Sequence, residues 1–253
     1  MRFNQKTAIV TGAGQGIGFD ICRQLVKEGA TVILNDADQE LITTASAKLN
    51  DEYKGKCLTV PGDCSQPETI NAMIKTATKT GGQVDIIIAN AGITLFGDFL
   101  SYTREAFNRV MEVNLAGSFF LAQAAANQMR SQTTGGSILF MSSVTAHQAH
   151  KDLAAYGMSK AALEMLARNL VVELSKYNIN VNTIAPGATL TERTRDEPGY
   201  KEIWSGLTPM GRPASVNDIT NAALFLVQEE SRHITGQNIV IDGGWTSISP
   251  QPY

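Results

Sequence analysis

Long apolar runs, runs of like charge and a high cysteine content are all missing from this 253-residue sequence. No stretch reaches the roughly 18 consecutive apolar residues that a membrane-spanning helix needs. The 21 lysines and arginines and the 24 aspartates and glutamates are spread along the chain. That balance argues against nucleic acid and anionic membrane surfaces as partners. What remains is an ordinary globular composition.

The three cysteines do not indicate a metal site. Cys22, Cys57 and Cys64 lie in or beside predicted helices and strands, and none is spaced with a histidine as metal ligands are. We therefore expect free thiols in a reducing compartment, and no bound metal. Residues 1–6 contain no apolar stretch that could act as a secretion signal, so a cytoplasmic protein is expected.

Short β-branched runs alternate with longer helical patterns, which predicts parallel strands joined by crossover helices. Strand 84–89 is almost continuously apolar, as is typical of a sheet covered on both faces. No repeat or linker interrupts the pattern, so we expect a single α/β domain over residues 1–253. Its fold would be a Rossmann-type, doubly wound, parallel seven-stranded sheet with helices on both faces. The expected strands are 6–10, 31–35, 57–60, 84–89, 136–142, 179–184 and 238–241, and the helices 16–28, 38–50, 67–80, 103–130, 154–176 and 215–228.

The longest segment without clear periodicity is 188–213, which is rich in proline and glycine. Loops of this length are usually lids or disordered. Apolar residues such as Ile203, Trp204 and Leu207 argue against disorder. We expect a substrate lid with short helical turns; a static packing insertion is the alternative.

Four glycines stand between the first strand and the first helix, in the stretch TGAGQGIG at 11–18. Backbone N–H groups at such a helix start can hold a pyrophosphate without a cationic side chain. Gly12 and Gly16 would permit the tight turn, and Gly18 would allow close packing of helix on sheet. The spacing does not fit G-x-G-x-x-G, and a simple tight turn is the alternative interpretation.

The second strand runs directly into Asp36, eighteen residues after Gly18. A carboxylate there can accept hydrogen bonds from the adenosine ribose and would repel the 2′-phosphate of NADP. At about 4 Å and an effective dielectric of about 20, each unit of like charge costs about 4 kcal/mol. Gln15 in the loop is neutral, so it does not offset the repulsion between Asp36 and a 2′-phosphate. The pattern favours NAD over NADP.

Together these features resemble the short-chain dehydrogenase/reductase family, whose cofactor loop has the spacing Thr11-Gly12-x-x-x-Gly16-x-Gly18. Further motifs of that family follow in order: Asp63 after the third strand, Asn90-Ala91-Gly92, Asn114, Ser143 thirteen residues before Tyr156, Tyr156-x-x-x-Lys160, and P-G-x-x-x-T at 186–191. Thr189 departs from the isoleucine or valine common in the family. The resemblance implies an NAD(P)-dependent oxidoreductase with catalytic Ser143, Tyr156, Lys160 and Asn114. It implies cofactor contacts from Gly12, Gln15, Gly16, Ile17, Gly18, Asp36, Asp63, Cys64, Asn90, Gly92, Tyr156, Lys160, Pro186, Gly187, Thr189 and Thr191.

Alcohol oxidation requires a base that takes the hydroxyl proton as hydride leaves. A tyrosine has an ordinary pKa of about 10, so acting near neutral pH requires about 4 kcal/mol of phenolate stabilisation. An ammonium about 4 Å away supplies that amount, and the i to i+4 spacing puts Tyr156 and Lys160 on one helix face. We therefore expect Lys160 to lower the pKa of Tyr156.

Ser143 would donate a hydrogen bond to the substrate oxygen, but Ser142 beside it faces the other way on a strand. Periodicity cannot choose between them; only the interval to Tyr156 favours Ser143. By resemblance, Asn114 would hold a water that links Lys160 to solvent. His147 and His150 follow in a loop and match no motif.

The lid region has balanced charge, which points to neither an acidic nor a basic substrate. With an NAD-type Asp36, a polar loop after Ser143 favours oxidation of a secondary alcohol in a sugar, polyol or sugar acid. The alternatives are reduction of 3-oxoacyl thioesters and a non-catalytic dinucleotide sensor. The apolar surplus on helix 154–176 and the family-like tail at 242–245 predict a homotetramer.

Overall fold

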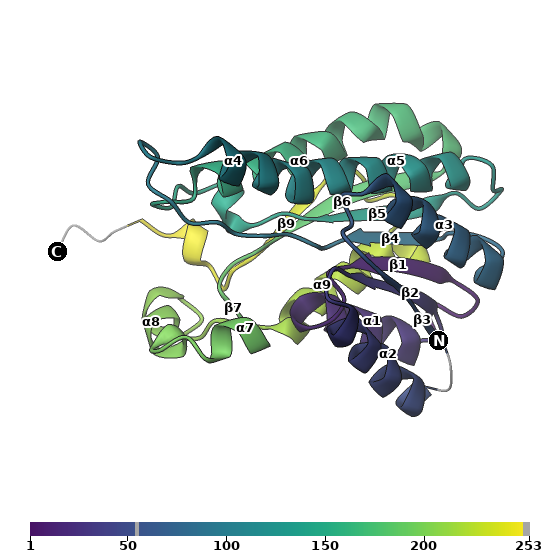
Figure 1. The fold of residues 1–253 in the computed structure, drawn as a ribbon, viewed down its shortest axis with the longest axis horizontal. Helices are drawn as coiled ribbons and strands as arrows, with labels where there is room; N and C mark the ends of the chain where they lie inside the picture. Colours follow the sequence, from purple (N-terminus) through teal and green to yellow (C-terminus); the bar gives the residue numbers. More distant parts are fainter. Residues whose placement is uncertain (54–55, 250–253) are drawn as a thin grey trace.

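Seven parallel strands form the central sheet of the computed structural model, which describes residues 1–53 and 56–249 (Figure 1). Their order is β3-β2-β1-β4-β5-β6-β9. The predicted strand ends agree with the structure to within two residues. The strand order reverses between β1 and β4, where the carboxyl ends of doubly wound sheets open a binding crevice. The strands are β1 (Thr7–Thr11), β2 (Thr31–Asp36), β3 (Cys57–Pro61), β4 (Ile86–Ala89), β5 (Gly136–Met141), β6 (Ile179–Pro186) and β9 (Asn238–Ile241).

Helices cover both faces of this sheet, which confirms the predicted doubly wound architecture (Figure 1). One face is covered by α1 (Gly16–Lys27), α2 (Gln39–Tyr53) and α9 (Val216–Val227), the other by α3 (Pro67–Gly81), α5 (Gly117–Met129) and α6 (Ala154–Leu174). Neighbouring strand residues alternate between two hydrophobic clusters: Val10 and Leu34 pack in the first, Ile9 and Ile33 in the second. This two-sided burial explains the nearly unbroken apolar strands.

The predicted helix 103–130 is not one regular helix. It consists of α4 (Arg104–Val110), a π-helical segment η1 (Met111–Ala116) and α5. A π turn holds more residues than an α turn, and such turns occur often at functional sites. Asn114 lies in this widened turn and is completely buried. The apolar pattern averages over several turns, which is why it did not predict this local irregularity.

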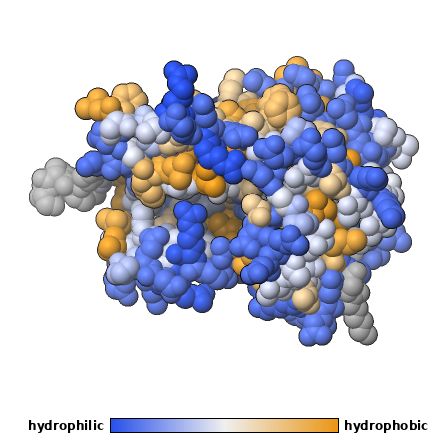
Figure 2. Space-filling model, viewed as in Figure 1, coloured by the Kyte–Doolittle hydropathy of each residue, from blue (hydrophilic) through white to orange (hydrophobic). Residues whose placement is uncertain are grey.

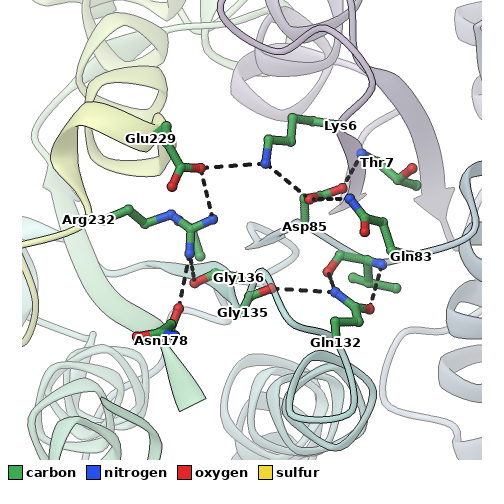
Figure 3. Close-up of polar contacts among 12 residues, drawn as sticks. Lys6, Thr7, Gln83, Asp85, Gln132, Gly135, Gly136, Asn178, Glu229 and Arg232 are labelled. Atoms are coloured by element: carbon green, nitrogen blue, oxygen red, sulfur yellow. Dashed lines mark hydrogen bonds and ion pairs between the residues drawn. The ribbon is translucent and has the colours of Figure 1, made fainter. Parts of the chain in front are cut away.

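Charged side chains link the starting ends of the strands, at the edge of the sheet away from the crevice (Figure 3). The ammonium of Lys6 lies 3.4 Å from the buried carboxylate of Asp85 and 3.5 Å from Glu229. Glu229 also pairs with Arg232 at 3.4 Å, and Arg232 donates to the carbonyl of Gly136 at 2.9 Å. The network ties the starting ends of β1, β4 and β5 together. It lies at the edge of the sheet opposite to the carboxyl ends of the strands.

The 188–213 segment projects beyond the carboxyl edge of the sheet (Figure 1). It carries β7 (Thr189–Leu190), α7 (Glu192–Arg195) and α8 (Tyr200–Leu207), and β7 pairs in parallel with β8 (Ala214–Ser215). Short 3-10 turns complete the chain: η2 (Val144–Ala146), η3 (Ser175–Tyr177), η4 (Glu229–Ser231) and η5 (Trp245–Ser247). Among the helices in the described ranges, none combines the length and apolarity needed to cross a membrane.

Candidate active site

The glycine loop between β1 and α1 has a backbone that other residues would disturb. Gly12 and Gly16 both have φ of 61°, in the left-handed region that favours glycine. A Cβ atom on Gly18 would lie 2.1 Å from the carbonyl oxygen of Gly12. The side chain of Asn90, directly after β4, donates to the carbonyls of Thr11 (2.9 Å) and Gly12 (3.0 Å). The loop is therefore held open at the start of α1, where backbone N–H groups can face an anion; those of Gly14 and Gly16 are bonded to Asp36 and Glu192.

Asp36 ends β2 beside this loop. Its Oδ2 accepts a hydrogen bond from the backbone N–H of Gly14 at 3.1 Å, and its Oδ1 accepts one from Asp38 at 3.1 Å. A Cβ atom on Gly14 would lie 3.0 Å from that Oδ2. The carboxylate is thus fixed at the rim of the glycine loop, as its position after β2 predicted.

Asp63 lies after β3 and forms an ion pair that the sequence did not predict. Its carboxylate is 2.7 Å from the guanidinium of Arg109 on α4. Burial raises the pKa of Asp63, but hydrogen bonds from Ser65 and Arg109 outweigh this effect and hold the pKa below its ordinary value. Arg109 also reaches Glu112 at 3.5 Å. A cation thus lines the same cavity as Asp36, but it is paired with two other carboxylates, Asp63 and Glu112.

Two adjoining cavities open at the carboxyl ends of the strands. One of about 290 Å³ lies over the glycine loop, and one of about 590 Å³ reaches Tyr156; both are lined by Asn90, Gly92, Thr191 and Arg193. Figure 2 shows the hollow above the 188–213 segment, bordered by hydrophobic residues. Gly18 packs beneath the loop. The other expected cofactor residues line one cavity or both: Gly12, Gln15, Gly16, Ile17, Asp36, Asp63, Cys64, Asn90, Gly92, Tyr156, Lys160, Pro186, Gly187, Thr189 and Thr191.

The glycine loop touches the 188–213 segment through a carboxylate. Oε2 of Glu192, at the start of α7, accepts a hydrogen bond from the N–H of Gly16 at 2.9 Å. This oxygen occupies a position that a phosphate oxygen would take at the same N–H. A pyrophosphate oxygen at that N–H would be repelled by the Glu192 carboxylate in this arrangement. The sequence did not predict this contact.

Tyr156, near the start of α6, faces Ser143 at the end of β5. The pKa of Tyr156 is raised by burial, while contacts with the side chains of Ser143 and Thr94 and the charge of Arg193 act in the opposite direction. This corrects the prediction that Lys160 lowers the pKa of Tyr156. Burial is the largest influence on this pKa, and Nζ of Lys160 lies over the tyrosine ring, 5.6 Å from its centre.

Lys160 is 3% exposed, and its ammonium donates to the carbonyl of Met141 at 2.8 Å. Burial lowers the pKa of Lys160 to about 8. A Cβ atom on Gly92 would lie 3.1 Å from this Nζ, so glycine at that position keeps the approach to the amine clear. The amine can therefore both accept and release a proton near neutral pH.

The side chain of Asn114 is hydrogen-bonded to the backbone of the turn that follows β4. Its Oδ1 accepts from the N–H of Ile93 at 2.8 Å, and its Nδ2 donates to the carbonyl of Ile93 (3.0 Å) and to Oγ of Ser159 (3.1 Å). A Cβ atom on Gly92 would lie 3.4 Å from Oδ1 of Asn114 as well as 3.1 Å from Nζ of Lys160. The structure thus brings Asn114 to the Lys160 side of the site, without direct contact with the larger cavity.

The structure resolves the choice between the two adjacent serines. Ser142 points to α6, where its Oγ donates to Glu164 at 2.6 Å, whereas Ser143 lies next to the Tyr156 hydroxyl. The buried carboxylate of Glu164 is also 2.9 Å from His147. Both serines follow the last residue of β5 and line the larger cavity, so it is the bond of Ser142 to Glu164 and the position of Ser143 beside the phenol that distinguish them.

The comparisons with known proteins agree with this geometry. A family model described as enoyl-(acyl carrier protein) reductase matches residues 12–246. L-rhamnose-1-dehydrogenase of Scheffersomyces stipitis is 34% identical over 252 residues, which is 95% of this chain and 96% of that relative. Galactitol 2-dehydrogenase of Agrobacterium fabrum is 34% identical over 260 residues, with 98% and 100% covered. The crystal structure of a short-chain type dehydrogenase/reductase from Mycobacterium marinum matches with a TM-score of 0.91, at 32% identity and with 97% of both chains covered.

The chain belongs to the short-chain dehydrogenase/reductase family. It is therefore an NAD(P)-dependent oxidoreductase, as the sequence motifs predicted. The cradle fits a dinucleotide on its own geometry as well, because the positive φ angles of Gly12 and Gly16 and the contact of Gly18 with Gly12 each require glycine. No group of three or more potential metal ligands occurs among the residues that the structure describes.

Four residues of this dehydrogenase/reductase site were not found from the sequence. Thr94 and Arg193 line the larger cavity, Arg109 pairs with Asp63, and Glu164 fixes Ser142. None lies in a motif, and each reaches the site from a different segment of the chain. Their only signal in the sequence is a polar residue in a loop or on a helix face, which is common on any surface.

Proposed function

We propose that this protein oxidises a hydroxyl group of a sugar or polyol to a carbonyl, with NAD as hydride acceptor and Tyr156 as general base. The observation that carries the proposal is the position of the Tyr156 phenol beside Ser143 in a cavity of about 590 Å³. That volume is ample for a monosaccharide. The cavity adjoins the cradle, so the substrate carbon and the nicotinamide would meet between Tyr156 and Pro186.

Each catalytic residue has a separate task in this proposal. The bound dinucleotide supplies the hydride acceptor. Tyr156 takes the hydroxyl proton, and Ser143 donates a hydrogen bond to the same oxygen as charge develops there. In its neutral form, which the pKa of about 8 makes accessible, Lys160 would take this proton and release it to water. Asn114 keeps the turn of Gly92 open so that water can reach the amine.

NAD is the proposed cofactor because Asp36 lies at the rim of the cradle. Its carboxylate would hold the adenosine ribose hydroxyls and repel a 2′-phosphate. Arg109 does not offset this repulsion, since it is paired with Asp63 and Glu112.

The cytoplasm is the proposed location: Cys22, Cys57 and Cys64 are buried free thiols, which suits a reducing compartment.

The substrate class is supported by the relatives and by the lining of the cavity. Two of the relatives above are named for L-rhamnose and for galactitol. In this chain the 188–213 segment, the proposed lid, lines the larger cavity with both polar and aromatic side chains. The description of the matching family model favours a second candidate, reduction of a thioester on acyl carrier protein.

The test is a turnover assay at about 340 nm, where reduced nicotinamide absorbs, with sugars, polyols, sugar acids and 3-oxoacyl thioesters. We expect oxidation of a sugar or polyol with NAD at a kcat/KM of about 10⁴ M⁻¹s⁻¹ or more for the natural substrate. Heat-treated protein is the control for background reduction of NAD. Turnover confined to thioesters would replace this proposal with the second candidate.

We propose that the enzyme is a homotetramer whose subunits meet on the face of α5 and α6. Exposed apolar side chains lie there: Phe120 is 50% exposed, Met165 53% and Val172 86%. A groove of about 620 Å³ runs between the two helices. Such a patch is typical of an interface.

We expect light scattering at micromolar concentration to give four times the subunit mass. Val172→Glu should lower the measured mass. A monodisperse monomer would contradict the proposal.

A further inference from the structure

Four aromatic side chains from three segments form a continuous row beside the larger cavity. His150 follows η2, Tyr200 and Trp204 lie on α8, and Trp245 lies in η5. Ring centres are 5.1 Å apart for His150 and Trp245, 5.5 Å for Trp245 and Trp204, and 6.2 Å for Trp204 and Tyr200. His150, Tyr200 and Trp204 line the cavity, and Trp245 packs behind them. We call these four residues the aromatic row.

Hydrogen bonds hold the segments that carry Tyr200, at one end of the row, and Trp245. The hydroxyl of Tyr200 accepts from the N–H of Thr189 at 3.2 Å, which ties α8 to β7. The carboxylate of Asp242 accepts from the N–H groups of Gly244 (2.8 Å) and Thr246 (2.7 Å), on either side of the indole in η5. Figure 1 shows this turn, in yellow, on the same side of the molecule as α8. The row is therefore built before any ligand arrives, and binding on it has a small ordering cost.

Polar groups share the cavity with the aromatic row. Thr94, Ser143 and Thr145 line it together with the Tyr156 hydroxyl. A site of this kind has flat apolar surface for contact and a few polar groups for orientation. It suits a ligand that is apolar on a face and polar around an edge. A long acyl chain would leave the polar groups unpaired, at a cost for each.

A sugar ring has this shape. Its axial C–H bonds form a face that can lie on an aromatic ring. The π surface of that ring is negative and attracts the hydrogen atoms of the C–H bonds, which carry a partial positive charge. Its hydroxyl groups point outward to hydrogen-bonding partners. An open-chain polyol has the same groups but no fixed face, and it must lose chain entropy to present one.

We propose that the aromatic row is a subsite for a sugar ring, so that this enzyme takes the cyclic form of a monosaccharide in preference to an open-chain polyol. The proposal rests on the proposed function above and narrows its substrate class. Trp204 supplies the stacking surface, and Trp245 is a positioning residue that holds Trp204 edge-on, at an interplanar angle of 79°. The ring hydroxyl to be oxidised then points across the cavity to Ser143 and Tyr156.

The test compares matched pairs of aldose and alditol, such as L-rhamnose with L-rhamnitol and D-galactose with galactitol, on the wild type and on Trp204→Ala. We expect the wild type to prefer the aldose of a pair. Trp204→Ala should lower kcat/KM for the aldose about tenfold or more, mainly through KM, and change that for the alditol less than about threefold. Trp204→Phe should keep part of the preference, and Trp245→Ala should act like Trp204→Ala but more weakly.

Leu207→Ala is the matched control, because Leu207 is 49% exposed on the same helix and does not line the cavity. It should leave both activities unchanged. NADH affinity, followed by fluorescence titration, should be the same in every variant and shows that each is folded. Equal losses on aldose and alditol in Trp204→Ala, or a wild type that prefers alditols, would overturn the ring subsite while leaving the proposed function intact. Turnover of thioesters alone would overturn both.

Discussion

Replacement of Tyr156 by phenylalanine is expected to lower kcat for alcohol oxidation by a factor of about 10³, within the range of about 10² to 10⁴ for loss of a positioned acid or base. Phenylalanine keeps the ring against Lys160 but has no oxygen to take the hydroxyl proton. Binding of NADH should weaken only slightly, because the phenol is one of many expected cofactor contacts and the glycine loop is built by other segments. Steady-state assays give kcat, and fluorescence titration gives the dinucleotide affinity.

The pH profile provides a second measurement on the same pair of proteins. Burial raises the pKa of Tyr156, so the phenol is protonated near neutral pH. Oxidation needs the phenolate. At pH values below the pKa, the phenolate fraction grows about tenfold for each unit by which the pH is raised, so kcat/KM of the wild type should rise with pH. Reduction needs the phenol and should fall in the alkaline range. Residual activity of Tyr156→Phe should lack the rise. Wild-type turnover in this variant would exclude Tyr156 as the base.

Substitution of Asp36 by serine is expected to raise the ratio of kcat/KM for NADP to that for NAD by about 100-fold. Asp36 is partly exposed, so water and salt screen its repulsion of a 2′-phosphate below the value of about 4 kcal/mol for two charges about 4 Å apart near a protein surface. A factor of 100 corresponds to about 2.7 kcal/mol. Removal of the charge should also weaken the binding of NAD, since the ribose hydroxyls lose their hydrogen-bond acceptor.

The control for this change is Asp38→Ser, which removes a charge two residues away. Oδ1 of Asp38 accepts from the N–H of Leu41 at the start of α2, and serine can replace that cap. Its cofactor ratio should stay within about threefold of the wild type. Initial rates with both dinucleotides at several concentrations give the ratios. An unchanged preference in Asp36→Ser would show that another group, with Arg109 the first to examine, selects the cofactor.

Much of the fold could be predicted from the sequence because its signals are local. Apolar runs such as 86–89 and the glycine loop at 12–18 depend only on neighbours in the chain. The motif residues Ser143, Tyr156 and Lys160 follow β5 or lie in α6, and strand order brings such ends together at one edge. Their placement around one cavity agrees with the prediction; their catalytic roles stay proposals until the variants are measured.

Contacts between distant segments could not be predicted. The side chain of Asn114 is bonded to the backbone of Ile93, and Arg109 is paired with Asp63, a carboxylate 46 residues earlier in the chain. The row formed by His150, Trp204 and Trp245 joins three segments that have no motif in common. Such contacts have no periodicity that a sequence could show.

By itself, the sequence determined the α/β class, the cofactor cradle and the family, since repeating patterns and glycine positions encode backbone geometry directly. Tertiary structure alone decided which serine faces Tyr156 and where the aromatic row stands. It also decided the direction in which the pKa of Tyr156 moves. The physical reason is that desolvation and electrostatic interaction depend on distance and burial in three dimensions. A spacing of four residues on a helix placed Lys160 over the tyrosine ring, but burial is the largest influence on the pKa of Tyr156 and raises it.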